Sequence, residues 1–287
     1  MPSPHDYVEL RTRSAFSFLE AASNPEDLIQ AAAALGHSTL ALADRDGVSG
    51  APRFHRAAQE AGLRALVGAE IGVGEIRSEG AGSEAEGIRR FGEIDASKTA
   101  PPPRNSSTAS PSLFSPPDRL LLLAESPVGW QRLCRLLSLA HSRRDKSLEA
   151  RDRRARHLIR VSWEELAEEE GHWSVLLRGD ERLRPELLDR AHEIFGERLA
   201  VDVSHLLDRR SERVSRRAVA LAESRRVTVV ATGDVRCARA SDRRLLDALV
   251  CLRERKTLAT AGRHLPPNGE GYLHSREEIV RRFRDRP

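Results

Sequence analysis

The chain has 287 residues, of which 47 are Lys or Arg and 43 are Asp or Glu, so its net charge is only +4. This near balance does not single out a nucleic-acid-binding face. No apolar run approaches the roughly 18 residues that span a bilayer. The 3 cysteines are widely spaced and form no CxxC pair, which argues against a disulfide framework. We therefore expect a cytoplasmic protein without membrane contact, built as one large α/β domain or two small ones.

Short apolar runs predict seven or eight strands, and helical periodicity appears between them. The strand candidates cover residues 7–10, 39–43, 63–67, 119–124, 158–161, 173–177, 199–203 and 227–232. The helices between and after them begin near residues 25, 52, 127, 163, 185, 208 and 276. Asn24 and Pro25 illustrate the start signals, since an Asn cap followed by a first-turn Pro is typical of a helix N-terminus.

Two stretches interrupt this alternation. Residues 73–117 are rich in Gly, Ser, Glu and Pro, a composition that buries too little apolar surface to offset the entropy of ordering, so we expect a disordered insertion there. Residues 142–156 are strongly charged, and without interleaved aromatic residues they fit a solvated connector better than a DNA-binding arm.

The alternation of strands and helices, with no hairpin signal, predicts a parallel barrel or an open wound sheet. The chain contains neither GxGxxG nor GxxxxGK[ST], which weakens a dinucleotide-binding or P-loop interpretation. Asp44 and Glu70 each come directly after a predicted strand. Chemistry in α/β folds concentrates at the carboxyl ends of parallel strands, so we expect a site there.

The stretch from Thr39 to Ile71 resembles the polymerase-and-histidinol-phosphatase (PHP) domain at the amino terminus of bacterial DNA polymerase III alpha subunits, most nearly their error-prone class. The turns Ala43-Asp44-Arg45 and Gly68-Ala69-Glu70 stand where the family usually has TDH and GxE. The resemblance implies an α/β fold of a distorted seven-stranded (β/α) barrel. It also implies a PHP-like domain over residues 1–240 and a helical segment over 241–287 that would lead into a polymerase domain.

An active PHP site resembles a cluster of three metal ions held by histidines and carboxylates, where metal-bound hydroxide attacks phosphoesters. The resemblance places the family's histidine positions on arginines in this chain. These arginines are Arg11, Arg13, Arg45, Arg119 and Arg236. It places acidic ligand positions on Asp44, Glu70, Asp202 and Asp234, with His205 as the one remaining histidine candidate.

An arginine keeps its proton in a protein, so it repels a cation instead of ligating it. We therefore expect a network of ion pairs in place of the metals, no resident cofactor and no catalytic residue. If the site were active, zinc or manganese would be held by Asp44, Glu70, His205 and Asp234.

The resemblance implies a fragment of an error-prone polymerase, linked to DNA replication and translesion repair, which lacks the polymerase catalytic part and contacts DNA only indirectly. Its expected partners are that catalytic portion or other replication and repair proteins. Two alternatives stay open: a metal-dependent phosphoesterase or 3′–5′ exonuclease that uses the retained acids, and a basic DNA-binding module whose affinity would fall steeply with salt.

Overall fold

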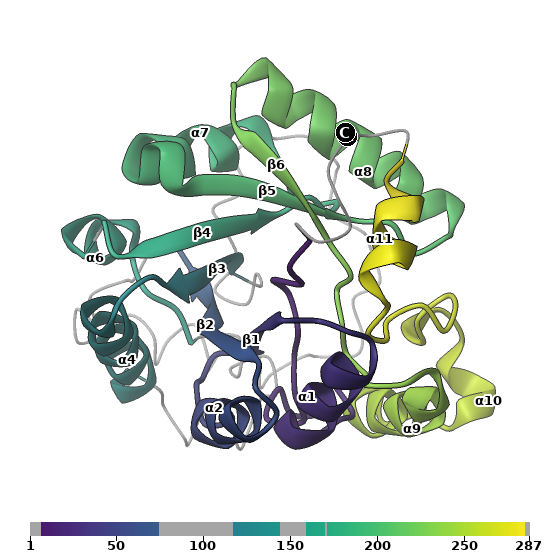
Figure 1. The fold of residues 1–287 in the computed structure, drawn as a ribbon. Helices are drawn as coiled ribbons and strands as arrows, with labels where there is room; N and C mark the ends of the chain where they lie inside the picture. Colours follow the sequence, from purple (N-terminus) through teal and green to yellow (C-terminus); the bar gives the residue numbers. More distant parts are fainter. Residues whose placement is uncertain (1–6, 75–116, 144–158, 170, 285–287) are drawn as a thin grey trace, which may run out of the picture.

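The protein is described by a computed structural model, which covers residues 7–74, 117–143, 159–169 and 171–284. Its centre is a curled six-stranded sheet with helices along the outside of the curve (Figure 1). The strands follow one another in the sheet in chain order: β1 (Thr39–Arg45), β2 (Arg64–Val73), β3 (Asp118–Ala124), β4 (Trp173–Arg178), β5 (Leu199–Ser204) and β6 (Thr228–Thr232).

Strand β3 runs antiparallel to both of its neighbours, which corrects the expectation of an all-parallel sheet. Val73 at the end of β2 pairs with Asp118 at the start of β3. The chain thus reverses across the predicted insertion, so that β2 and β3 form the two arms of a hairpin with a very long connection. Residues 75–116 lie outside the described part of the chain, so the predicted disorder there stays a prediction. Residues 144–156 of the charged connector also lie outside it.

The amino-terminal segment lies between β1 and the chain that follows β6. Its contacts are isolated bridges, Glu9 with Leu40 and Thr12 with Val235, and the strand expected at residues 7–10 is therefore absent as a regular element. Backbone hydrogen bonds hold both sides: the Val235 amide donates to the Arg11 carbonyl at 2.9 Å and the Ala41 amide donates to the Glu9 carbonyl at 3.0 Å. The strand expected at residues 158–161 is likewise reduced to a bridge of Val161 with Val73, and residue 158 is not described.

The helices begin where the sequence signals place them. They are α1 (Pro25–Ala34), α2 (Ala51–Glu60), α4 (Pro127–Ser142), α6 (Trp163–Glu168), α7 (Pro185–Phe195), α8 (Arg209–Ser224), α9 (Arg243–Glu254), α10 (Leu258–Ala261) and α11 (Arg276–Arg282). Short 3-10 turns cover η3 (Gly196–Arg198), η4 (Ala240–Asp242) and η5 (Gly262–His264). The Ser162 hydroxyl accepts from the Glu165 amide at the start of α6, in a capping box. None of the helices in the described ranges is long and apolar enough to cross a membrane.

Side chains alternate between the two faces of the curled sheet, as a strand period of two requires. Leu40 and Leu42 pack outwards with residues of α1 and α2. Ala41 and Ala43 instead join Leu121 in a separate inner cluster. The inner face is therefore filled with aliphatic residues along most of its length, and polar groups are left for its end.

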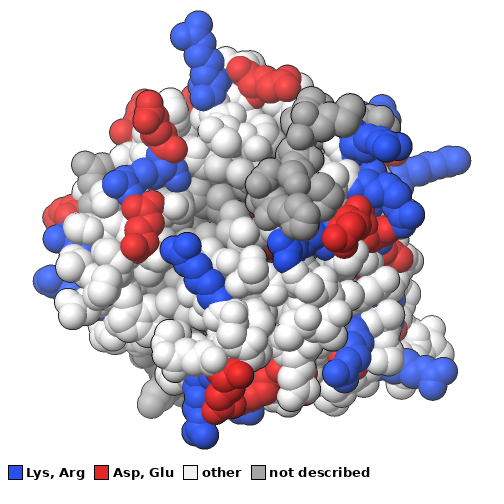
Figure 2. Space-filling view, viewed as in Figure 1, with Lys and Arg blue, Asp and Glu red and all other residues white. Residues whose placement is uncertain are grey.

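The chain after residue 240 packs against the rest of the protein. Leu246 and Val250 of α9 form a buried cluster with Cys237, and Phe283 packs on the main core. The division into residues 1–240 and 241–287 stays a prediction. Figure 2 shows basic and acidic side chains interspersed over the face viewed there.

Candidate functional site

The register of the sheet brings five charged side chains to one edge of its inner face. Arg45 pairs with Glu70 across β1 and β2, and Arg178 pairs with Asp202 across β4 and β5. Arg119 lies at the same edge because β3 is antiparallel, which places its first residues beside the last residues of β2. All five positions are in phase with the inward-facing aliphatic residues of their strands.

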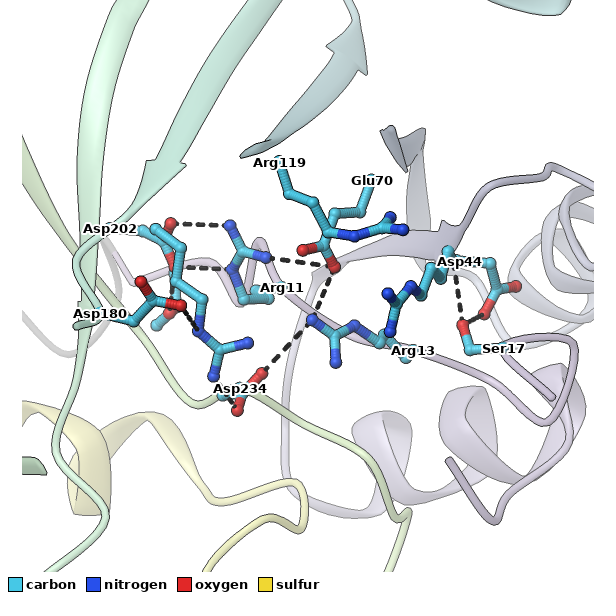
Figure 3. A network of polar contacts seen from close by, with 12 residues as sticks. Arg11, Arg13, Ser17, Asp44, Glu70, Arg119, Asp180, Asp202 and Asp234 are labelled. Carbon is cyan, nitrogen blue, oxygen red and sulfur yellow. Dashed lines mark hydrogen bonds and ion pairs between the residues drawn. The ribbon is translucent and has the colours of Figure 1, made fainter. Parts of the chain in front are cut away.

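Arg11 is the centre of this group (Figure 3). It is 1 % exposed and forms a bidentate ion pair with Asp202, with Nε–Oδ2 at 2.6 Å and Nη2–Oδ1 at 2.8 Å. Its Nη1 also lies 3.6 Å from Oε2 of Glu70. A planar guanidinium therefore connects two strands that are not neighbours in the sheet.

Arg13 continues the network towards the end of β6. Its Nη2 donates to Glu70 Oε2 at 2.6 Å and lies 3.9 Å from Asp234 Oδ1. Asp234 in turn accepts from Arg236 at 2.9 Å and from Arg178. We call these seven side chains the inner network: Arg11, Arg13, Glu70, Arg178, Asp202, Asp234 and Arg236.

The inner network keeps its carboxylates ionised. Burial alone would raise the pKa of the Glu70 carboxyl, but the guanidinium groups of Arg13 and Arg11 outweigh burial and hold that pKa well below its usual range. The pKa of Asp234 is lowered in the same way, as Arg178 and Arg236 overcome the effect of burial. These carboxylates are therefore bound to cations, in the electrostatic role that metal ions would play.

Asp44 lies outside the inner network, although the sequence placed it among the same acids. Its carboxylate accepts from the Ser14 amide, the Ser14 hydroxyl and the Ser17 hydroxyl, each at 2.7 Å. The reason is strand phase: Asp44 follows Leu40 and Leu42, which face outwards. Burial raises the pKa of Asp44, and the hydrogen bonds from Ser17 and Ser14 oppose that rise without reversing it.

Arg45 and Arg119 are inward-facing but pair with acids that the sequence interpretation did not single out. Arg119 forms two hydrogen bonds of 3.0 Å with Asp46, and Arg45 pairs with Glu20 and lies 3.7 Å from Asp46. The expectation that all five arginines face the four candidate acids is thus only partly right. Arg178 is a further addition, and its position directly after a predicted strand was the signal that could have identified it.

Glu9 is a second residue that sequence reasoning missed. It is 1 % exposed and accepts from the Tyr7 hydroxyl at 2.5 Å, the Gly233 amide at 2.7 Å and the Arg11 amide at 2.9 Å. Burial raises the pKa of Glu9 to about 7 in spite of these donors. Gly233 is required here, because a Cβ at this position would lie 2.6 Å from Glu9 Oε2.

His205 follows β5, and its ring packs edge-on against Phe283 with 6.1 Å between centroids. In the described ranges no group of three or more His, Cys, Asp or Glu side chains is arranged to hold a metal ion. The oxygens of Glu70, Asp202 and Asp234 contact guanidinium nitrogens, and those of Asp44 accept hydroxyl and amide protons. The residues present therefore do not fit the metal cluster that the resemblance implies.

A family model described as PHP domain matches residues 9–205. The chain belongs to the PHP family. It is 34 % identical over 283 residues to the error-prone DNA polymerase of Anaeromyxobacter sp. strain K, covering 98 % of this chain and 21 % of that protein. It is 30 % identical over 296 residues to the error-prone DNA polymerase of Mycobacterium bovis, covering 96 % of this chain and 23 % of that protein. The PHP chain therefore spans about a fifth of the length of these relatives.

Among solved structures, the PHP chain is similar to an amidohydrolase from Chromobacterium violaceum with bound sulfate and no metal. The TM-score is 0.45 at 15 % identity, and the match covers 80 % of this chain and 87 % of that one. The resemblance to the PHP domain of error-prone polymerases, which rested on the turns at Asp44 and Glu70, is confirmed by the family match and the relatives.

Proposed function

We propose that this chain is the PHP region of an error-prone DNA polymerase, with a barrel-like fold closed by the amino-terminal segment, and that it acts as a structural or docking domain without hydrolase activity. The inner network carries the proposal. Arg11 and Arg13 occupy the space between Glu70, Asp202 and Asp234, so the carboxylates are neutralised by groups that cannot activate water.

The distinction between guanidinium and metal is chemical as well as electrostatic. Both neutralise a buried carboxylate, but only a metal lowers the pKa of a bound water enough to make a nucleophile near neutral pH. A guanidinium has no open coordination position and no acidic proton at this pH. The inner network therefore supports a role in which the fold is retained and the phosphoesterase chemistry is lost.

The test is metal content combined with activity. We expect purified protein to contain well under one zinc, manganese or iron per chain by mass spectrometry of the elements. We also expect no manganese-dependent release of phosphate from bis-p-nitrophenyl phosphate or of nucleotides from single-stranded DNA. Stoichiometric metal together with manganese-dependent hydrolysis that Glu70→Ala abolishes would establish the phosphoesterase alternative instead.

The proposed partner is the polymerase catalytic portion, supplied by the remaining four fifths of proteins such as the relatives described above. Co-expression of this chain with the corresponding portion of the Anaeromyxobacter relative, tagged on that portion only, should retain the chain through size-exclusion chromatography. Separate elution of the two polypeptides would contradict the docking role. On the face seen in Figure 2 the charges alternate in sign, which does not favour the basic DNA-binding module.

A further inference from the structure

A pocket of about 240 Å³ opens beside the inner network, and its wall is dominated by arginine. Seven arginines line it: Arg13, Arg45, Arg119, Arg178, Arg182, Arg236 and Arg253. Four carboxylates share the wall: Glu20, Glu70, Asp118 and Asp180. Leu177, Leu183 and Leu187 form an apolar side, which lowers the local dielectric and strengthens the field of the charges.

The carboxylates of the wall each have a guanidinium partner of their own. Glu70 binds Arg13 and Glu20 binds Arg45. Asp118 forms two hydrogen bonds with Arg184, which stands outside the pocket. Asp180 lies 3.9 Å from Arg178. These acids are therefore engaged, and they reduce the positive charge of the pocket without cancelling it.

The remaining acceptors behind the wall are shared. Asp46 serves both Arg45 and Arg119, and Asp234 serves both Arg178 and Arg236. Each guanidinium has five N–H donors in a rigid fork, so two carboxylates cannot satisfy four guanidinium groups. Donor capacity at this wall exceeds the acceptors that the protein provides.

Two of the arginines are also fixed in place before any ligand arrives. Arg13 is 4 % exposed, and the Arg119 side chain is 10 % exposed. The Nε atoms of both are buried without a hydrogen-bond partner in the described structure. Buried donors held by fixed ion pairs lose little conformational entropy when they bind an anion, which is the condition for preorganised recognition.

The structure assigns this pocket to an oxyanion of the phosphate type, bound by the forks of Arg119, Arg178 and Arg236 and not hydrolysed. A phosphate group offers several acceptor oxygens and up to two negative charges, which match multiple guanidinium forks better than a single carboxylate does. This goes beyond a structural role, because it gives the domain a ligand. The phosphate can be free, or it can be the terminal phosphate of a polynucleotide.

The experiment is calorimetric titration of the full chain at low ionic strength in the presence of EDTA, so that metal-mediated binding is excluded. Inorganic phosphate, sulfate and acetate are titrated first. A 5′-phosphorylated dinucleotide and its 5′-hydroxyl counterpart follow. We expect saturable binding of phosphate and sulfate and at least tenfold weaker binding of acetate. Equal binding of acetate, or no saturable binding of phosphate, would overturn the assignment.

The variants are matched in charge. Arg119→Gln should weaken phosphate binding at least tenfold, and Arg182→Gln, at an exposed position on the rim, should weaken it severalfold without disturbing the fold. Arg225→Gln removes the same charge at the end of α8, where Arg225 pairs with Asp189, and should bind phosphate as the unaltered chain does. The same affinity in all three variants would show an adventitious ion only.

The dinucleotide arms separate the two sources of phosphate. Tighter binding of the 5′-phosphorylated dinucleotide than of inorganic phosphate, with no binding of the 5′-hydroxyl form, identifies a polynucleotide end as the ligand. Affinity for inorganic phosphate that equals or exceeds that of the dinucleotide identifies the free ion. Failure of the structural role is distinguishable, because it would be seen as bound metal and hydrolysis, whereas this test is run without metal.

Discussion

Asp44 and Glu70 end neighbouring strands that pair residue by residue, yet their surroundings are opposite. Glu70 lies within 3.6 Å of two guanidinium groups, and its pKa is held far below the ordinary value. Asp44 is buried among hydroxyl and amide donors at 2.7 Å, and its pKa is raised. One carboxylate is stabilised by charge and the other by neutral hydrogen bonds.

The difference teaches that the phase of a strand decides what a strand-end acid can do. Side chains alternate across the sheet, and Asp44 and Glu70 fall on opposite faces. The inner face collects Arg11, Arg13 and the acids between them, while the outer face meets the turn that contains Ser14 and Ser17. Two acids that look equivalent in a motif are therefore separated by the sheet itself.

Arg11→Ala should have the largest effect on this contrast. It leaves Asp202 and part of the charge of Glu70 buried without a cation, and breaking a buried pair in this way costs about 3–5 kcal/mol of unfolding free energy. Urea unfolding followed by circular dichroism measures it. Arg225→Ala, at a half-exposed surface pair, should change the midpoint very little; equal losses in the two variants would contradict the special role of the inner network.

The titration of Glu9 should produce the next largest effect. Burial raises its pKa from 4.5 to about 7 in the folded protein, so in this window the folded state holds a proton that the unfolded state has released. The contribution to stability is complete below pH 4.5 and is lost as the pH rises to about 7. The total change is roughly 3 kcal/mol.

Glu9→Gln should remove that decline in stability between the two pH values, as measured by urea unfolding at a series of pH values. Glu60→Gln on the exposed face of α2 serves as the control and should leave the decline unchanged. A decline that persists in Glu9→Gln would show that another group titrates. Below this window the sign reverses, because Glu70 and Asp234 have lowered pKa values and their contribution is lost as acid protonates them.

Asp44→Asn should cost less than loss of an inner-network cation. The variant keeps the shape of the side chain, but its amide group cannot accept from all three donors at Ser14 and Ser17, and an unsatisfied buried donor costs about 1–3 kcal/mol. Glu70→Gln is the matched variant on the inner face and should cost more, since it leaves Arg13 without its nearest anion. Equal unfolding free energies for Asp44→Asn and Glu70→Gln would remove the contrast drawn above.

The smallest effect concerns the packing that surrounds Asp44. A Cβ at Gly50 would lie 2.8 Å from Asp44 Oδ2 and 3.1 Å from Ser14 Oγ, so Gly50→Ala should cost about 1–2 kcal/mol by overpacking. At Gly47 a Cβ would meet only the Arg45 carbonyl at 3.9 Å, and Gly47→Ala should be close to neutral. Thermal unfolding of both variants decides whether the outer-face carboxylate is as tightly enclosed as its distances indicate.

Local signals in the sequence were sufficient for the helices and for most strands. The Asn24-Pro25 start of α1, the capping box at Ser162 and the apolar runs of β3 and β5 all lie where the sequence predicted them. Such elements depend on periodicity and on caps within a few residues, so a single sequence carries the information. The pairing of Arg11 with Asp202 was anticipated only as part of a group of charges.

What the sequence by itself determined is the set of charged residues at strand ends, including the arginines in place of histidines, and hence the family. Tertiary structure alone decided the antiparallel direction of β3, the recruitment of Arg178, Glu20 and Asp46, the burial of Glu9 and the exclusion of Asp44 from the inner network. The physical reason is that pairing direction and strand phase are set by contacts between residues far apart in the chain. A shift of one residue moves a side chain to the other face of the sheet.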